Sequence, residues 1–186
     1  FQAQVGFMDY GILNTLQVDP YGNINSTALG DYEGEHRRFG GPGGADSIAA
    51  LCWRTVLMTD QETRKFVERV DFISSPGFLD GSEGARERAG LPTGTGPYRV
   101  VTPWAVYDYE DRKLRLIAVS PWVTVEQVLE RCEYPPIVAK EIATLEGPTE
   151  EELTILRTEL DPRGQNTAER SAWIVYDGDT YTRAEG

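Results

Sequence analysis

The sequence predicts an α/β domain built on a single sheet. Short apolar segments typical of buried strands alternate with segments typical of helices, and Gly-rich loops join them. The chain has 186 residues, 40% of them hydrophobic and 26% charged, which is enough to bury a core without disulfides. We therefore expect one globular domain over residues 1–165 and a C-terminal tail over residues 166–186.

The N-terminal half predicts three strands, a turn and a helix. Pro20 and Gly22 predict a chain reversal over residues 19–23. A cluster of glycines leads directly into residues 45–51, which have the composition of a helix. The predicted strands cover residues 5–13, 54–59 and 66–75. The last of these is expected to bury four side chains: Val67, Val70, Phe72 and Ile73.

The C-terminal half predicts a long ordered loop over residues 78–97 and then two strands. Residues 98–109 and 113–120 have strand composition, and Glu110-Asp111 is the expected hairpin turn between them. Two capping boxes follow, each a Thr with Gln or Glu three residues later, so two helices are expected. The boxes are Thr124 with Gln127 and Thr149 with Glu152. The second helix is expected to dock on the body through three leucines: Leu153, Leu156 and Leu160.

The tail over residues 166–186 has three open interpretations. It is a small hairpin around Asp177-Gly178, an edge strand added to a partner, or a frayed end. The N-terminus is also informative, because the sequence starts at Phe1 and not at Met. That start is typical of a processed, trimmed or truncated product.

Composition excludes several classes of function. A net charge of -12 argues against a nucleic-acid partner, because phosphate binding needs clustered Lys and Arg. No apolar run approaches a membrane span and no secretory leader is visible, so a cytoplasmic protein is expected. Cys52 and Cys132 have no CxxC partner, which favours two reduced thiols over a disulfide or metal site. His36 is the single histidine, which leaves little for a Ser-His-Asp triad or a zinc cluster.

The run Gly40-Gly41-Pro42-Gly43-Gly44 is the first candidate for chemistry. Glycines let the backbone approach a ligand, and free N–H groups before a helix suit a phosphate or a developing oxyanion. The spacing fits neither a P-loop nor a G-x-G-x-x-G nucleotide motif. The alternative interpretation is a purely structural turn.

Polar residues upstream of that run are further candidates. Asn25 has two amide donors that would polarise a carbonyl, or it simply makes turn hydrogen bonds. Glu33 and Glu35 beside His36 form either an acid–base pair or an exposed run of charge.

Arginines flank the same region in sequence. Arg37 and Arg38 immediately precede the glycine run and are candidates to reach a phosphate. Arg86 and Arg88 lie among glutamates in the long loop and are interpreted as a solvated, salt-bridged surface.

Several of these segments together resemble the second, B-type subunit of family I CoA-transferases of the glutaconate CoA-transferase kind. The likeness runs over about the first 160 residues, and the order and spacing of its motifs are more specific than any one of them. The segments are Gln17-Val18-Asp19-Pro20-Tyr21-Gly22-Asn23-Ile24-Asn25-Ser26-Thr27, Arg38-Phe39, Gly41-Pro42-Gly43-Gly44-Ala45, Ser74-Ser75-Pro76-Gly77-Phe78-Leu79-Asp80-Gly81, Arg86-Glu87-Arg88, Gly90-Leu91-Pro92 and Gly96-Pro97.

The resemblance implies an open, mostly parallel sheet with flanking helices, of the CoA-transferase/NagB-like type. It also implies a hetero-oligomer with an A-type subunit and an active site between unlike chains. Coenzyme A is then a substrate, with a carboxylic acid as its acceptor, and no metal or permanently bound cofactor is implied. By position, the oxyanion donors are Asn25, Gly43 and Gly44, and the CoA-binding positions are Arg38, Gly41 and Ala45.

The resemblance also implies a glutamate that attacks the acyl-CoA thioester and becomes a glutamyl-CoA thioester. No segment of this sequence resembles the motif that bears that glutamate, and neither Glu33 nor Glu35 matches it. In the family this motif precedes the region that the sequence resembles. The alternatives are therefore a CoA-thioester hydrolase or decarboxylase on the same scaffold, or a non-catalytic subunit that completes a CoA pocket.

Overall fold

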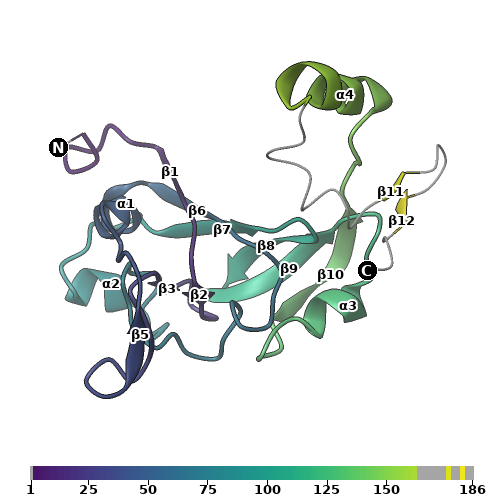
Figure 1. Ribbon diagram of the computed structural model, residues 1–186. Coiled ribbons are helices and arrows are strands. Elements are labelled where there is room, and N and C mark those ends of the chain that lie inside the picture. The colour runs from purple at the N-terminus through teal and green to yellow at the C-terminus, as the bar shows by residue number, and fades with distance from the viewer. Residues whose placement is uncertain (1, 163–174, 177–180, 183–186) are drawn as a thin grey trace.

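The molecule is built on one six-stranded sheet (Figure 1). It is described from a computed structural model, for residues 2–162, 175–176 and 181–182. The strand order is β1-β6-β7-β8-β9-β10, with parallel pairs at β1–β6, β6–β7 and β9–β10 and antiparallel pairs at β7–β8 and β8–β9. The predicted open, mostly parallel α/β sheet is therefore confirmed. The strands are β1 (Tyr10–Leu13), β6 (Arg54–Met58), β7 (Pro97–Val101), β8 (Ala105–Glu110), β9 (Lys113–Val119) and β10 (Ile137–Thr144).

The β8–β9 hairpin forms where the sequence predicts it. Asp111 and Arg112 both have positive φ, 48° and 67°, so the turn has the geometry that matches the twist of paired strands. One predicted strand over residues 98–109 is two strands in the structure. The chain reverses between them, where Thr102 N donates to Ala105 O at 2.9 Å.

Short antiparallel pairs lie outside this sheet. β2 (Gln17–Val18) pairs with β3 (Ile24–Asn25), and β4 (Ala28–Gly30) pairs with β5 (His36–Arg38). In the tail, β11 (Val175–Tyr176) pairs antiparallel with β12 (Tyr181–Thr182). The residues that would connect and extend this last pair lie outside the described part of the chain, so the three interpretations of the tail stay open.

Three helices begin where the sequence predicts them, and a fourth was not predicted. Helix α1 (Ala45–Leu51) has the predicted bounds, and both predicted capping boxes are present, at Thr124 before α3 (Val125–Leu129) and at Thr149 before α4 (Glu150–Ile155). A short α2 (Ala85–Arg88) interrupts the long loop. Helix α1 packs on the sheet because β1 carries Gly11 there. A Cβ on Gly11 would lie 2.2 Å from the Ile48 side chain.

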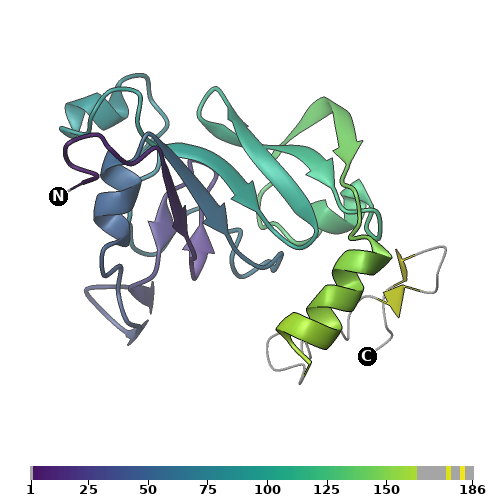
Figure 2. The ribbon, with the colours of Figure 1, turned by 90° about the horizontal axis from the view of Figure 1, so that it is seen from above.

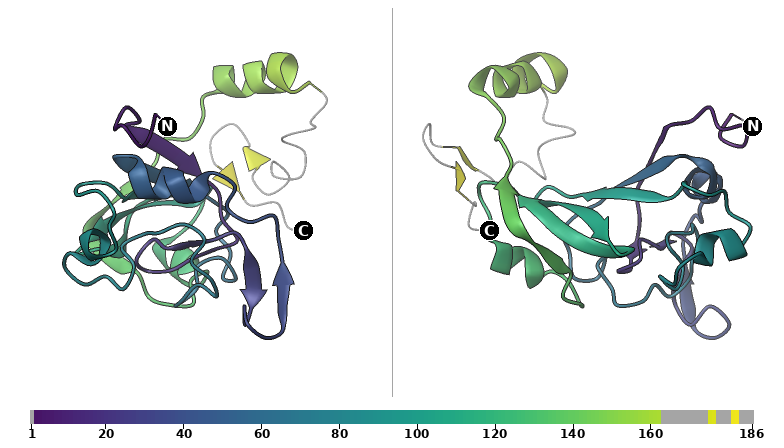
Figure 3. Two further views of the ribbon diagram at one scale, coloured as in Figure 1. Left: turned by 90° about the vertical axis from the view of Figure 1, so that its left-hand side faces the viewer. Right: turned by 180° about the vertical axis from the view of Figure 1, so that it is seen from behind.

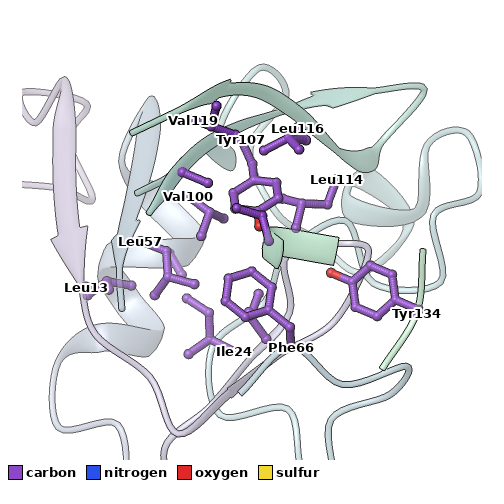
Figure 4. Close-up of a cluster of buried hydrophobic side chains, with 14 residues drawn as sticks. Leu13, Ile24, Leu57, Phe66, Val100, Tyr107, Leu114, Leu116, Val119 and Tyr134 are labelled. Atoms are coloured by element: carbon purple, nitrogen blue, oxygen red, sulfur yellow. The ribbon is translucent and has the colours of Figure 1, made fainter. Parts of the chain in front are cut away.

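The core fills one face of the sheet (Figure 4). Leu114 and Leu116 of β9 and Tyr107 of β8 point from the sheet towards Phe66, and all four are at most 1% exposed. Because side chains alternate along a strand, the same register that buries these residues turns their neighbours to the opposite face.

The expected strand over residues 66–75 is wrong. The segment makes strand-like contacts only at its ends, as isolated bridges from Phe66 to Val18 and from Ser75 to Ile24. Val67 and Val70 are buried as expected, but Ile73 is 46% exposed. Val67 and Val70 are three residues apart, whereas residues on one face of a strand are two apart. The segment is irregular, with several bends.

The expected docking of the second capped helix is also wrong. Helix α4 continues as a π-helical turn, Leu156–Leu160, and neither segment contains a buried residue. Leu160 is 73% exposed. Figure 3 shows α4 standing clear of the sheet in both views. Strand β10, with the charged residues Lys140 and Glu141 at its centre, was not predicted at all.

Candidate active site

The glycine run forms an open surface loop between β5 and α1. Gly41 and Gly43 have φ of +81° and +57°, a conformation that favours glycine, and Gly44 is the N-cap of α1. A Cβ on any of Gly40, Gly41, Gly43 and Gly44 would meet nothing within 4 Å. The loop therefore leaves its backbone accessible instead of packing against the body.

Three N–H groups of this loop have no partner within the described chain, those of Gly40, Gly43 and Gly44, and the last two are adjacent. Gly41 N donates to Ser26 O at 3.1 Å, and Ala45 N donates to Pro42 O at 2.9 Å, which fixes both ends of the loop. Between them, the N–H groups of Gly43 and Gly44 donate to no acceptor among the described residues, and both residues are exposed. Adjacent free donors on fixed backbone are the arrangement that binds an oxyanion.

Asn25 lies beneath this region and is fully buried. Its amide Nδ2 donates to Gln17 Oε1 at 2.7 Å and to Ala28 O at 2.6 Å. Its Oδ1 accepts from Thr27 N at 3.0 Å and, more weakly, from Ser74 Oγ at 3.4 Å. The side chain thus ties β2 and β3 to the start of β4.

These bonds bear on the expected role of Asn25 as an oxyanion donor. Both amide hydrogens are already donated inside the chain, so neither is free for a substrate oxyanion in this arrangement. Asn25 instead holds Thr27 and Ala28, at the start of β4. Phe39 N donates to Thr27 O and Gly41 N to Ser26 O, in the segment that Asn25 holds.

The charged residues before the loop lie on the exposed β4–β5 hairpin. The Arg38 guanidinium stacks over the Tyr32 ring at 5.7 Å and Arg37 over Phe39 at 5.2 Å. His36 stacks on Tyr32 and its Nδ1 lies 3.2 Å from Gly34 O. The structure therefore shows no Glu–His pair among these described residues, and the exposed-charge interpretation holds for Glu33 and Glu35.

The turn over residues 19–23 is buried and held by side-chain hydrogen bonds. Asp19 is buried, which raises the pKa of its carboxyl, and it accepts from the backbone N–H groups of Tyr21 and Asn23 at 3.0 Å. Asn23 Oδ1 in turn accepts from Gly77 N at 2.9 Å. A Cβ on Gly77 would lie 2.3 Å from the backbone of Gly22. Two of the segments that carry the resemblance thus interlock through their backbones.

Arg86 was assigned to a solvated surface, and that assignment is wrong. It is 5% exposed, forms no ion pair among the described residues, and burial lowers the pKa of its guanidinium. It joins α2, the C-terminal end of α1 and the long loop. Its bonding partners are Pro76 O, Gly77 O, Ala49 O, Ala50 O and Thr95 Oγ1. Arg88 is exposed, as expected.

Two hollows of the surface lie away from the glycine loop. One of about 600 Å³ is lined by Arg54, Arg86 and Tyr98, among others, and another of about 970 Å³ includes Asp19 and Tyr134. Neither includes residues 40–44. The described part of the chain holds no group of three His, Cys, Asp or Glu side chains suited to a metal ion, and none of its helices is long and apolar enough to cross a membrane.

Comparison with known proteins matches most of the chain. Residues 1–131 match the coenzyme A transferase family. The B-type subunit of glutaconate CoA-transferase from Acidaminococcus fermentans is 40% identical over 148 residues, which cover 78% of this chain and 54% of that protein. The B-type subunit of 3-oxoadipate CoA-transferase from Pseudomonas knackmussii is 37% identical over 159 residues, which cover 84% of this chain and 60% of that protein.

The fold matches as well as the sequence. The crystal structure of glutaconate coenzyme A-transferase from Acidaminococcus fermentans has a TM-score of 0.77 and 35% identity, over 84% of this chain and 60% of that chain. The chain therefore spans a little over half the length of the curated relatives that it matches.

Proposed function

Because this chain belongs to the coenzyme A transferase family, we propose that it supplies the oxyanion-binding part of a CoA-transferase active site. The reaction moves CoA between an acyl-CoA thioester and a carboxylic or dicarboxylic acid. The observation that carries the proposal is the pair of unpartnered N–H groups at Gly43 and Gly44 on an open, anchored loop.

The chemistry requires this pair of donors more than once. A glutamate carboxylate attacks the thioester carbonyl, the C–S bond breaks, and a mixed anhydride and CoA thiolate form. The thiolate then attacks the glutamyl carbonyl and releases the acyl carboxylate, leaving a glutamyl-CoA thioester. Each attack makes a tetrahedral oxyanion, which fixed N–H donors stabilise. The proposal places the glutamate outside this chain.

Neighbouring residues have supporting roles in the same proposal. Asn25 positions the loop through its buried hydrogen bonds. Gly41 and Ala45 keep the backbone on either side of the donors close to the CoA ester. Arg38, exposed on β5 immediately before the loop, is suited to a phosphate of CoA because its guanidinium makes no ion pair among the described residues.

An A-type subunit is the proposed partner, in a hetero-oligomer without nucleic acid or membrane. A Cβ on any glycine of the loop would meet nothing within 4 Å, which leaves room for another chain or segment to complete the substrate cavity. Coenzyme A acts as a substrate, without a permanently bound cofactor. A cytoplasmic location belongs to the same proposal, because Cys52 and Cys132 are free thiols.

Transfer is favoured over the alternatives of thioester hydrolysis and decarboxylation. Both relatives named above, at 40% and 37% identity, are parts of CoA-transferases. A purely structural role for the chain is less well supported, because a structural turn has no need of two adjacent, exposed N–H groups without an acceptor among the described residues.

The experiment compares valine variants in the assembled complex. Gly44 has φ of -97°, so Gly44→Val adds no backbone strain and its side chain meets nothing, yet it blocks approach to the donors. We expect a loss of turnover of about 100-fold or more, as for loss of an oxyanion donor. Gly43→Val should abolish activity, with added strain from its φ of +57°.

Gly40→Val is the matched control. Its Cβ also meets nothing within 4 Å, but its N–H is not one of the proposed donors. For this variant we expect turnover close to that of the unmodified complex. The unfolding midpoints of all three valine variants are measured alongside, to show that each is folded. Full activity in Gly43→Val or Gly44→Val would remove the glycine loop from the mechanism.

A further inference from the structure

One hollow of the surface is lined by arginines that lack ion-pair partners. Its volume of about 600 Å³ is within the range of about 300–1,000 Å³ that small-molecule sites have. Arg54, Arg86 and Arg112 line it, together with the exposed carboxylates Glu83 and Glu87. None of these arginines forms an ion pair among the described residues. In a protein of net charge -12, the hollow therefore has an excess of positive charge.

The hollow lies where two parallel strands of the sheet begin. Arg54 is the first residue of β6, and Pro97 and Tyr98 begin β7. Helix α2 forms a further part of the wall. In Figure 2, α2 lies near the tail of the β6 arrow, and the β4–β5 hairpin lies beyond the opposite end of α1. Because α1 runs from the glycine loop to the start of β6, the hollow and the glycine loop lie at opposite ends of this helix.

Arg86 brings a buried charge to the hollow. Its terminal nitrogens donate only to uncharged acceptors, which are backbone carbonyls and the hydroxyl of Thr95. Its Nε is buried and has no hydrogen-bond partner among the described residues. Burial lowers the pKa of the guanidinium, and the nearby Glu87 offsets this effect only in part. Because a buried charge without a counter-ion is costly, an anion in the hollow would stabilise Arg86.

The other two arginines are held in place and have free donors. Arg54 Nη1 donates to the Tyr10 hydroxyl at 2.9 Å, and its guanidinium lies over the rings of Tyr10 and Tyr98 at 5.6 Å and 5.2 Å. Arg112 Nε donates to Gly81 O at 2.8 Å. In both guanidinium groups, Nη2 has no acceptor among the described residues. These free N–H groups are suited to a carboxylate or a phosphate.

Trp53 gives the same hollow a flat apolar wall. Its side chain is only partly covered, since the residue is 45% exposed. The indole Nε1 donates to Gly6 O at 3.1 Å, which fixes the plane of the ring. Gly94 contacts the ring with backbone alone, because a Cβ at this position would lie 3.6 Å from the indole. An exposed indole in a fixed plane is suited to stacking against a second flat ring.

We infer that this hollow binds an organic anion with a flat ring. The ring stacks on Trp53, the carboxylate or phosphate group binds the free N–H groups of Arg54 and Arg112, and the buried charge of Arg86 adds to the attraction. An aromatic carboxylate and a nucleoside monophosphate both have this chemistry. The inference concerns binding alone and does not rest on the proposed transfer of CoA.

Calorimetric titration of the chain with three probes tests the inference: benzoate, AMP and inorganic phosphate. We expect at least one of the two ringed probes to bind with a Kd below about 1 mM. Inorganic phosphate should bind at least about tenfold more weakly, because it lacks a ring to stack on Trp53. The tighter of the ringed probes identifies the source of the ligand, an aromatic acid or a nucleotide. A Kd above about 1 mM for both, or phosphate bound as tightly as either, would overturn the inference.

Arg54→Gln and Arg99→Gln are a matched pair of variants. Arg99 also stacks over the Tyr98 ring, at 4.2 Å, and forms no ion pair in the described part of the chain, but it is not among the described residues that line the hollow. Arg54→Gln should weaken binding of the ringed probe at least about tenfold, as for loss of a charge-assisted hydrogen bond, and Arg99→Gln less than about twofold.

Arg112→Gln is the second variant with the same expected loss of affinity. It replaces Arg54→Gln in the comparison if the unfolding midpoint without ligand shows that Arg54→Gln is not folded. Equal affinity of the ringed probe for the hollow variant and for Arg99→Gln would mean that the probe binds elsewhere, and it would overturn the inference.

Discussion

The side-chain amide of Asn25 donates a 2.7 Å hydrogen bond to the side-chain oxygen of Gln17, and both residues are buried. Gln17 in turn accepts from Asp71 N at 3.1 Å and donates to the Asp71 carboxylate at 3.0 Å. The segment under the glycine loop is thus held by a connected set of buried polar groups, in which each donor depends on its neighbour.

Asn25→Ala tests whether that residue positions the loop. Removing the side chain takes the Asn25 donor from Ala28 O and one of the two donors from Gln17 Oε1, which keeps Asp71 N. We therefore expect a loss of about 1–3 kcal/mol in the free energy of unfolding, measured in urea. Turnover of the assembled complex should fall more than affinity for the CoA ester does. Asn14→Ala, at an exposed site, is the control. An unchanged unfolding free energy would show that the Asn25 amide is not needed for the fold.

Arg86→Met tests the buried arginine. The change removes charge-assisted bonds to Gly77 O, Ala49 O and Thr95 Oγ1 while keeping similar bulk, so a loss of about 2–4 kcal/mol in unfolding free energy is expected. Arg88→Met, on the exposed side of α2, should cost less than about 1 kcal/mol. Equal effects of the two variants, measured by chemical denaturation, would restore the surface interpretation of Arg86.

The two capping boxes should differ in their contribution to stability. Helix α3 buries Val128 completely, so Thr124→Ala should lower the unfolding free energy by about 1 kcal/mol. Helix α4 buries no residue, so Thr149→Ala should reduce helical circular dichroism slightly without moving the main unfolding transition. A shift of that transition by Thr149→Ala would mean that α4 packs on the body in solution.

Cys132, which is half-buried, should react as a thiol of raised pKa. Burial raises its pKa to about 11, and its Sγ lies 3.7 Å from Val128 O. Because the thiolate is the reactive form, alkylation at pH 8 should be about 100-fold slower than that of an ordinary thiol. The rate should rise about 100-fold from pH 8 to pH 10, against about tenfold for a thiol of pKa 9. Site-resolved mass spectrometry measures this, and rapid alkylation at pH 8 would contradict the raised pKa.

Local signals in the sequence were sufficient for the elements that they govern. The capping boxes and the bounds of α1 depend on neighbouring residues and were predicted correctly. The β8–β9 hairpin was also predicted, but its turn is Asp111-Arg112, one residue after the predicted Glu110-Asp111. The prediction for residues 66–75 failed because an apolar composition was interpreted as a strand. Only Phe66 and Ser75 form bridges to other strands. The predicted docking of α4 failed because leucines on one side of a helix do not show that the protein offers a surface for them to pack against.

The candidate site divides in the same way. A run of glycines before a helix is a local signal, and it identified the loop. The partners of Asn25 and Arg86 were not predicted, because Gln17, Ala49 and Gly77 reach them only through the tertiary fold. The glutamates around Arg86 made it look solvated, although its side chain turns inward to backbone carbonyls.

The central claim is that the chain works in CoA transfer, and denaturing intact-mass spectrometry of the natively purified complex tests it most directly. The complex is measured before and after incubation with a dicarboxylic acyl-CoA. We predict that one polypeptide gains the mass of CoA less water, and that Gly44→Val prevents this gain. Consumption of the thioester without any polypeptide gaining that mass would contradict the account and favour hydrolysis or decarboxylation.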